Sequence, residues 1–495
     1  MKQASKAQPD ISAPAPSTIR RVATNAASVL ASDVTARAAT FVLYILISRY
    51  LGTFEFGQMS LGLTFFQTFQ LLAIGGLKIL VTREVAKDKT KTDKYLVNAS
   101  AVVTLLALIS VVALGIFVKM MQYSTDTTTV IMLLALGLLP YALSVICDAL
   151  FQAWEQMYYI TYANIIVNIG KVALGFLLLY QGYNLHYIAW LLFLSHLAVL
   201  IIKWWLLQRY ISRPQISFDL QFSVKMIKST ITFFGIDGLI AIMSSFNIIL
   251  LSKLASEIEV GLLSAASQIM IPVSLIFQSI VISVFPVMAR SFEPGYRRLK
   301  IVTERLIELL FTIALPTAVG LFFLADSALL LLYGDQDFAM ATGALRVLVG
   351  VLVLRVFTQV LGRVLVASLR EKVNFRILLI DLGANVILAP ILISQFGLMG
   401  AAITSLAVRV IDTVQHYIPV SRSFPGGIAL LKITWKTIVA SAGMGMYLAA
   451  VQDHNLWLTI TFGAMVYGVI LSVLILWSVG GPRQLKNEYL YLWSK

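Results

Sequence analysis

Long hydrophobic runs, separated by short polar segments, follow one another along almost the whole chain. A helix needs about 20 apolar residues to cross a hydrocarbon core roughly 30 Å thick. Runs of this kind occur at 29–48, 57–75, 98–118, 129–151, 159–180, 188–207, 230–251, 261–287, 306–325, 345–368, 374–393, 399–418, 437–451 and 457–478. The pattern predicts an all-α polytopic membrane protein with about 14 transmembrane helices. The thirteenth run is the shortest and the first is the most polar, so about 12 spans is the alternative.

The composition narrows the class of function. Hydrophobic residues make up 59% of the 495 residues and charged residues 13%, whereas soluble globular proteins carry about 25% charged residues. A soluble enzyme is therefore excluded. Cys147 has no second cysteine to pair with, and the four histidines lack metal-ligand spacing, so we expect no disulfide, metal or cofactor. Without an ATPase phosphate loop, a zinc-protease motif or a nucleophile elbow, no catalytic residue is predicted.

The basic residues lie mainly on one side of the predicted spans. With the N-terminus inside, 29 of the 38 lysines and arginines fall in cytoplasmic segments and 4 in outer segments. Short loops on the cytoplasmic side of membrane proteins favour positive charge, so both termini are predicted to be cytoplasmic, with residues 1–27 as a disordered tail. The net charge of +14 is then explained by cytoplasmic segments that face anionic membrane lipid, so a nucleic-acid partner is not needed to account for it.

A repeat relates the two halves of the chain. The segment SRYLGTFEFGQMS (48–60) aligns without gaps to SKLASEIEVGLLS (252–264), and the same offset carries Asp33 onto Asp237. Chance similarity between hydrophobic segments is the alternative. Six helices fit within the offset, and parallel repeats of this kind are typical of transporters. We expect a tail at 1–27, two pseudo-symmetric six-helix bundles at 28–229 and 230–436, and a terminal helix pair with a cytoplasmic tail at 437–495.

Ionisable residues also lie inside the predicted spans. The basic ones are Arg37, Lys171, Arg355, Arg363 and Arg409, and the acidic ones are Asp33, Asp148, Asp237, Asp381 and Asp412. A charge at the centre of a transmembrane helix costs about 2.5–3.5 kcal/mol even on lenient insertion scales. These side chains should therefore face the interior of a bundle or a hydrated cavity.

Helical spacing gathers these residues into stripes. Arg355, Gln359 and Arg363 share one face of a helix, as do Asn164, Asn168 and Lys171. Such stripes favour one hydrated cavity with a cationic lining. The alternative is structural pairing, because Asp33 with Arg37 and Arg409 with Asp412 are one turn apart. Lys171, Arg355 and Arg363 have no acidic neighbour one turn away.

Several motifs, taken in order, resemble one known family. SRYLGTFEFGQMS is followed by GGLKILVTREVAKDK (75–89), FQAWEQMYY (151–159), FPVMARSF (285–292) and ALPTAVGLFFLADSALLLLYG (314–334). Together they are similar to polysaccharide flippases of the Wzx type, in the multidrug/oligosaccharidyl-lipid/polysaccharide exporter (MOP) superfamily. The resemblance covers most of the chain.

The resemblance implies both an architecture and a cargo. It implies two six-helix bundles with a terminal helix pair, a V-shaped central cavity, and alternating access in the bacterial cytoplasmic (inner) membrane. The cargo would be an oligosaccharide linked to undecaprenyl diphosphate, turned from the inner to the outer leaflet. A cationic lumen for the diphosphate is expected, with Arg37, Lys171, Arg355, Arg363 and Arg409 as candidates. Unlike lipid II flippases, the chain has no arginine or lysine inside its second and eighth spans, which argues against a peptidoglycan precursor.

Ion coupling and partners are predicted less narrowly. Asp33, Asp148, Asp237 and Asp412 are candidates for ion coupling, and the machinery for polysaccharide polymerisation and export is an expected partner. One alternative is a cation-coupled multidrug exporter of the same superfamily, in which acidic residues bind cationic drugs. A membrane glycosyltransferase or polymerase is another, but the outer loops are short. A third alternative is a non-transporting scaffold for cell-wall assembly.

Overall fold

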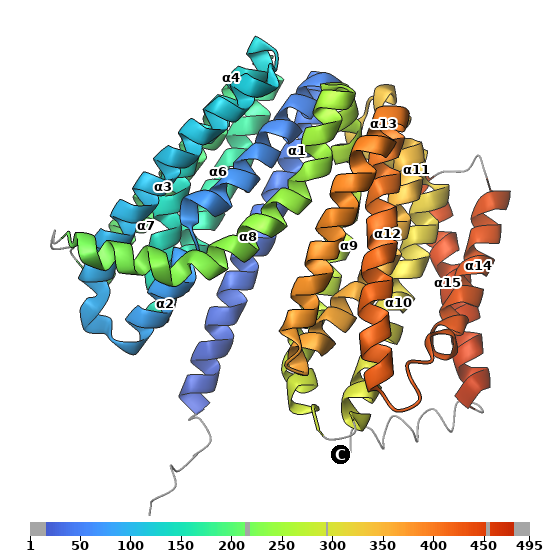
Figure 1. Cartoon of the computed structure of the whole chain (residues 1–495). Helices are drawn as coiled ribbons and strands as arrows, with labels where there is room; N and C mark the ends of the chain where they lie inside the picture. Colours follow the sequence, from blue (N-terminus) through green and yellow to red (C-terminus); the bar gives the residue numbers. More distant parts are fainter. Residues whose placement is uncertain (1–15, 213–217, 294–295, 452–455, 480–495) are drawn as a thin grey trace, which may run out of the picture. The chain divides into compact units, whose positions relative to one another are not determined.

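The chain folds into helices throughout its described parts. The computed structural model describes residues 16–212, 218–293, 296–451 and 456–479, and these residues contain no strand. The first half comprises α1 (Pro16–Ile74), α2 (Leu77–Lys87), the 3₁₀ helix η1 (Lys89–Lys91), α3 (Thr92–Met121), α4 (Thr125–Leu136), α5 (Leu138–Ala153), α6 (Tyr158–Tyr180) and α7 (Leu185–Tyr210). Figure 1 shows these elements in blue to green.

The second half begins with a long helix and ends with a pair. It comprises α8 (Leu220–Leu254), α9 (Glu257–Arg290), α10 (Arg297–Phe323), α11 (Ala325–Tyr333), the 3₁₀ helix η2 (Gln336–Ala341), α12 (Thr342–Ala367), α13 (Glu371–Ser423), α14 (Leu430–Ala450) and α15 (Leu456–Val479).

The predicted spans all lie in helices. By length and composition, ten of the described helical stretches could cross a membrane. Two of these helical stretches, α1 and α13, each contain two predicted spans. α1 breaks at Gly52 (φ 84°, ψ −172°), and α13 breaks at Gly397 (φ 50°, ψ −125°). Such positive-φ conformations are available essentially to glycine. The two other predicted spans lie in α8, whose apolar part is Gly238–Leu254, and in α14. An all-α multi-pass membrane protein is thus confirmed, and the structure is consistent with 14 spans.

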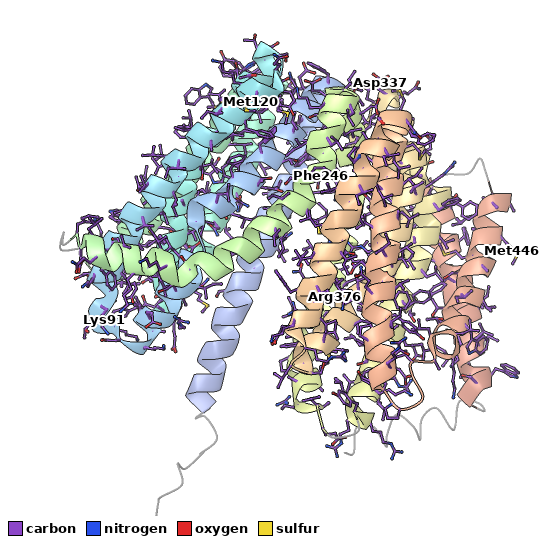
Figure 2. All side chains as sticks on the ribbon, viewed as in Figure 1. Lys91, Met120, Phe246, Asp337, Arg376 and Met446 are labelled. Atoms are coloured by element: carbon purple, nitrogen blue, oxygen red, sulfur yellow. The ribbon has the colours of Figure 1, made fainter. Side chains whose placement is uncertain are left out.

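Large apolar side chains cover the outer faces of the helices. Met120 on α3 is 76% exposed and Met446 on α14 is 71% exposed, and both project away from their helices in Figure 2. Exposed apolar surface on this scale is unfavourable in water but matches a lipid environment. It agrees with the hydropathy of the sequence.

The folded chain divides into two compact units. Unit 1 contains residues 1–46 and 65–242, and unit 2 contains 47–64 and 243–495. The bundle boundaries predicted from the sequence, at 229/230 and 436/437, stay a prediction. Residues 47–64 pack with the second half of the chain, although the repeat assigns them to the first.

Unit 1 is built around α5. Its core packs α2, α3 and α7 against α5 and includes the buried Cys147. A buried ion pair ties α5 to α7, because Lys203 Nζ lies 2.7 Å from Asp148 Oδ1. The charges are taken out of solvent as a pair, which limits the cost of their burial.

Unit 2 is built around α12. This helix packs against α9, α10 and α13, while α14 covers α10 and α15 covers α14. The core includes Phe277, Leu310 and Val360. An apolar cavity of about 460 Å³ lies among α10, α11, α14 and α15 and is lined by residues such as Pro316, Met444 and Tyr467.

Within unit 2, the two copies of the repeat touch. A Cβ atom on Gly261 would lie 2.6 Å from the carbonyl oxygen of Thr53 and 3.0 Å from the nitrogen of Gly57. Residues related by a two-fold operation meet in this way only near its axis. The contact of Gly57 with Gly261 therefore supports the repeat found in the sequence. Only glycine allows two backbones to approach so closely.

Two charged residues of the repeat, Arg49 and Glu259, contact the termini of helices in unit 2. Arg49 donates from Nε to the carbonyl oxygen of Leu332 (2.9 Å) and from Nη2 to that of Leu331, at the C-terminus of α11. Glu259 accepts the backbone N–H of Leu398, which begins the second half of α13. A cation at a helix C-terminus and an anion at an N-terminus are both favourable.

Candidate functional site

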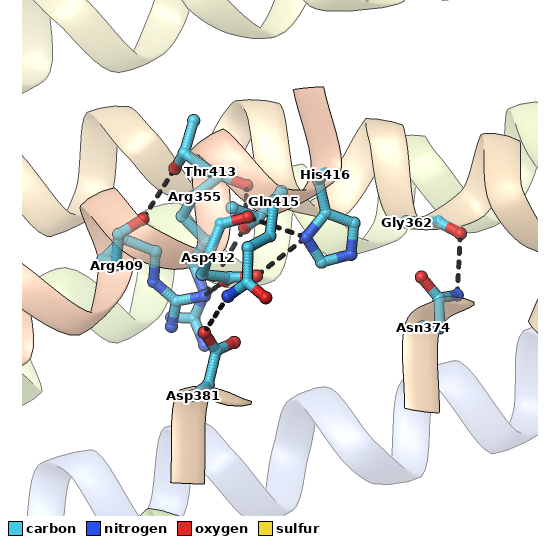
Figure 3. A network of polar contacts seen from close by, with 10 residues as sticks. Arg355, Gly362, Asn374, Asp381, Arg409, Asp412, Thr413, Gln415 and His416 are labelled. Atoms are coloured by element: carbon cyan, nitrogen blue, oxygen red, sulfur yellow. Dashed lines mark hydrogen bonds and ion pairs between the residues drawn. The ribbon is translucent and has the colours of Figure 1, made fainter. Parts of the chain in front are cut away.

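A polar network joins the two halves of α13. These halves run antiparallel around Gly397, because Gln415 Nε2 donates to Asp381 Oδ1 at 3.0 Å from the opposite arm. Asp381 is 4% exposed, and no ion pair to it occurs in the described residues. Figure 3 shows this pair beside Asp412 and Arg409. The hairpin thus brings together polar residues that are 34 positions apart in the sequence.

The centre of the network is the carboxylate of Asp412. Arg409 Nη1 lies 2.6 Å from its Oδ2, and His416 Nδ1 lies 2.8 Å from its Oδ1. Asp412 is 6% exposed and His416 is 9% exposed. One turn separates each partner from Asp412 on the same helix. The predicted pairing of Arg409 with Asp412 is present, with His416 as a second partner.

The cationic stripe on α12 faces α9. Arg355 donates from Nη1 to Ser274 Oγ at 3.0 Å, and the guanidinium of Arg363 lies 5.4 Å from the ring centroid of Phe285. Between them, the side-chain oxygen of Gln359 is buried and unpaired. Both arginines are half-buried, and neither forms an ion pair within the described ranges. A cation with only neutral partners at this depth is free to meet an anionic ligand.

The cations predicted in the first half lie in unit 1. Lys171 is half-buried on α6 and, within the part of the chain that the structure describes, makes no hydrogen bond or ion pair. On the same face, Asn164 Nδ2 donates to Ser32 Oγ at 2.7 Å, which joins α6 to α1. Arg37, on α1, is exposed.

The acidic candidates separate into three cases. Asp148 is held by Lys203. This lysine is one of the 29 basic residues counted as cytoplasmic, but it lies within the run 188–207 and is buried on α7. Asp412 is shared between two basic side chains. The side chains of Asp33 and Asp237 lie outside the described residues. The ion-coupling roles of all four stay predictions.

Two members of the network were missed as site residues. Asp381 is visible in the sequence as a charge within a span, but its closeness to Asp412 depends on the hairpin. Gln415 carries no charge and gives no signal of its own. No group of three His, Cys, Asp or Glu side chains in the described ranges could hold a metal ion.

Two family models match the chain, each over more than half of it. One, described as polysaccharide biosynthesis protein, matches residues 22–292. The other, described as lipid II flippase MurJ, matches residues 216–477. Together they cover both units.

Two curated relatives match over shorter stretches. A probable lipid II flippase of Bdellovibrio bacteriovorus is 29% identical over 190 residues, which is 37% of this chain and 36% of the relative. A probable flippase for low-salt glycan biosynthesis, Agl15 of Haloferax volcanii, is 24% identical over 222 residues, 43% of this chain and 47% of the relative. In each case the matched part spans less than half of the relative's length.

Solved structures resemble the whole fold. A lipid II flippase MurJ in an inward closed conformation matches with a TM-score of 0.72 at 17% identity, over 90% of this chain and 97% of that one. An inward-facing multidrug resistance transporter of the MATE family, in the MOP superfamily, matches with a TM-score of 0.67 at 16% identity, over 78% and 95% of the two chains. At such identities the likeness concerns the fold alone.

Proposed function

The chain belongs to the polysaccharide biosynthesis family of the MOP superfamily, and we propose that it turns a lipid-linked oligosaccharide from the inner to the outer leaflet of the bacterial cytoplasmic membrane. The proposal makes it a transporter that uses no catalytic residue of its own. The two curated relatives named as flippases support this cargo class.

One observation carries the proposal. Arg355 and Arg363 are half-buried on one face of a membrane helix and pair with a serine and an aromatic ring instead of an acid. Placing a charged side chain at membrane depth costs free energy, so we expect such a side chain where it binds a ligand. The guanidinium group binds phosphate oxygens in a bidentate fork, so a diphosphate is the chemistry that suits this stripe.

The mechanism follows from placing the cargo on these cations. Arg37, Lys171, Arg355, Arg363 and Arg409 would bind the diphosphate, a hydrated cavity would accept the sugars, and the polyprenyl tail would stay in lipid while the two bundles alternate in access. An inside-negative potential favours the outward step, because about 2.3 kcal/mol per charge per 100 mV amounts to roughly 5 kcal/mol for a dianion.

The finer features are part of the same proposal. We expect an undecaprenyl diphosphate carrier, cytoplasmic termini, and the polymerisation and export machinery as partners. The spans 57–75 and 261–287 contain no arginine or lysine, so the headgroup is expected to differ from lipid II.

A flipping assay tests the cationic stripe. The probe is a nitrobenzoxadiazole-labelled polyprenyl-diphosphate oligosaccharide in proteoliposomes, and dithionite reports its exposure. Each charged hydrogen bond contributes about 1.5–3 kcal/mol, so Arg355→Ala with Arg363→Ala should slow flipping about tenfold or more. The double lysine variant keeps the charge and should lose less.

Arg298→Ala is the matched control, because this arginine on α10 is exposed, with 78% of its side chain accessible. It should flip the probe at the wild-type rate. Unchanged flipping by the double alanine variant would overturn the cationic-stripe mechanism. Export of a cationic dye by the wild type, with no flipping of the probe, would instead favour the multidrug exporter, for which the paired Asp148 and Asp412 are poorly suited.

A further inference from the structure

Asp412 serves two basic side chains at once. Its Oδ2 binds Arg409 Nη1 at 2.6 Å and its Oδ1 binds His416 Nδ1 at 2.8 Å (Figure 3). His416 Nδ1 also lies 3.0 Å from the backbone oxygen of Asp412. Oxygen acceptors on this side favour the tautomer with its proton on Nδ1. The other nitrogen, Nε2, has no hydrogen-bond partner in the described residues and can accept a proton.

Several charged and titratable groups surround this carboxylate. From α13 come Asp381, Arg409, Asp412 and His416, and α12 adds Arg355, which is within electrostatic range of Arg409. Arg363 lies on α12, two turns further along, over Phe285. Arg370, at the start of α13, donates to the Pro419 oxygen and to Ser423. From α9, only Ser274 and Phe285 meet these cations. The side chain of Asp237 on α8 is not described.

An arginine that is paired with a carboxylate attracts an anion less than an unpaired one does. Arg409 and Asp412 form such a pair, which carries no net charge while His416 is neutral, whereas Arg355 donates to Ser274. Asp412 holds Nη1 of Arg409, so the full charge of Arg409 is available to a diphosphate when this arginine leaves Asp412. The carboxylate would then be buried beside Asp381, with a neutral imidazole as its partner. A buried charge that loses its counter-ion is strongly unfavourable.

We propose that Asp412 and His416 form a proton-linked switch that releases Arg409 to the diphosphate of the lipid headgroup. As the guanidinium leaves Asp412, one proton from water adds to Nε2 of His416. The resulting imidazolium keeps its Nδ1–H on Asp412 and replaces Arg409 as counter-ion. When the diphosphate leaves, Arg409 returns and the proton goes back to water. The inference rests on the proposed function, since it assigns Arg409 to the headgroup.

This linkage has a fixed sign. Uptake of a proton on binding means that the affinity for the diphosphate rises as the pH falls, and by reciprocity the diphosphate strengthens proton binding. One linked proton changes the affinity at most about tenfold per pH unit. Asp412 and His416 act as positioning residues, because they do not touch the ligand themselves.

Titration calorimetry of the full chain in detergent tests the switch. The probe is farnesyl diphosphate, measured from pH 6 to pH 8 and in two buffers of different ionisation enthalpy, which gives the number of protons taken up. For the wild type we expect up to one proton per ligand beyond any taken up by the phosphate itself. His186→Gln, outside the network on α7, is the control and should match the wild type.

Two variants have opposite expected signatures. In His416→Gln, Arg409 stays on Asp412 and the imidazole that takes up the proton is missing, so the affinity at pH 6 should fall about tenfold and lose the part of its pH dependence that is due to His416. In Asp412→Asn, Arg409 is free at every pH, so the affinity at pH 8 should rise by about the same factor.

The outcomes separate the switch from the function. If the wild type binds the probe without extra proton uptake, or if His416→Gln keeps the wild-type pH profile, the switch is wrong and flipping is unaffected as a proposal. If the wild type does not bind the probe at any pH, diphosphate recognition and the switch fail together. Equal affinity of Asp412→Asn and the wild type at pH 8 also overturns the switch.

Discussion

Unit 1 and unit 2 each bury an aspartate against a basic side chain, but the two pairs differ in how many partners they have. Asp148 lies 2.7 Å from Lys203, and both side chains are largely buried. Asp412 divides its carboxylate between Arg409 and His416. A closed pair has nothing left to exchange and is suited to holding two helices together. A carboxylate with two partners can release one of them.

Removing one charged side chain should destabilise the protein more at the Asp148–Lys203 pair than at Asp412. Lys203→Met removes the ammonium group and keeps the stem, which leaves Asp148 charged and buried. Breaking such a pair typically costs about 3–5 kcal/mol, the largest effect expected here. Thermal unfolding of the detergent-solubilised protein measures it.

A double variant sharpens that measurement. Lys203→Met with Asp148→Leu removes both charges, and well-packed apolar replacements of buried pairs are often neutral. It should recover most of the lost stability. If Lys203→Met alone is as stable as the wild type, the pair is solvated and its role in joining α5 to α7 is wrong.

The shared carboxylate should tolerate the equivalent change better. Arg409→Met leaves Asp412 with His416, which can take up a proton and replace the lost counter-ion, so the loss is expected near that of one charged hydrogen bond, about 1.5–3 kcal/mol. The same unfolding measurement, run beside Lys203→Met, compares the two units directly. A larger loss for Arg409→Met than for Lys203→Met would reverse the comparison.

The exposed ion pair of Asp219 with Lys94 is expected to contribute the least to stability among the pairs compared. Asp219, just before α8, accepts the backbone N–H of Phe222 and pairs with Lys94 at 3.0 Å. These contacts, the Phe222 bond first, lower the pKa of Asp219 below its usual value. The contribution to stability is therefore present at neutral pH and is lost as the pH falls below about 4.

Asp219→Asn should remove that acid dependence with only a small loss at pH 7, since exposed ion pairs contribute little. Unfolding midpoints between pH 3 and pH 7 provide the check, with the wild type as reference. A large loss at neutral pH would show that the segment before α8 is held more tightly than its exposure suggests.

The positions of the spans were accessible from the sequence because lipid imposes a simple rule. Each crossing must satisfy its own backbone hydrogen bonds and present apolar side chains, so the runs, the basic loops and the intramembrane charges could be read directly. The repeat could also be found in the sequence, because the close contact between Gly57 and Gly261 requires glycine at both positions. The pairing of Arg409 with Asp412 followed from helical spacing.

Partners on other helices could not be read in this way. Hydropathy and spacing describe one helix at a time, whereas Asp148 finds Lys203 on α7 and Asp381 finds Gln415 across the α13 hairpin. The sequence by itself determined which predicted spans carry charges, because the cost of such a charge is local, but not their burial, since Arg37 is exposed and Lys203 is 2% exposed. Only the tertiary structure decided which of the charges are neutralised, because an ion pair depends on a few ångströms between helices that the chain order does not specify.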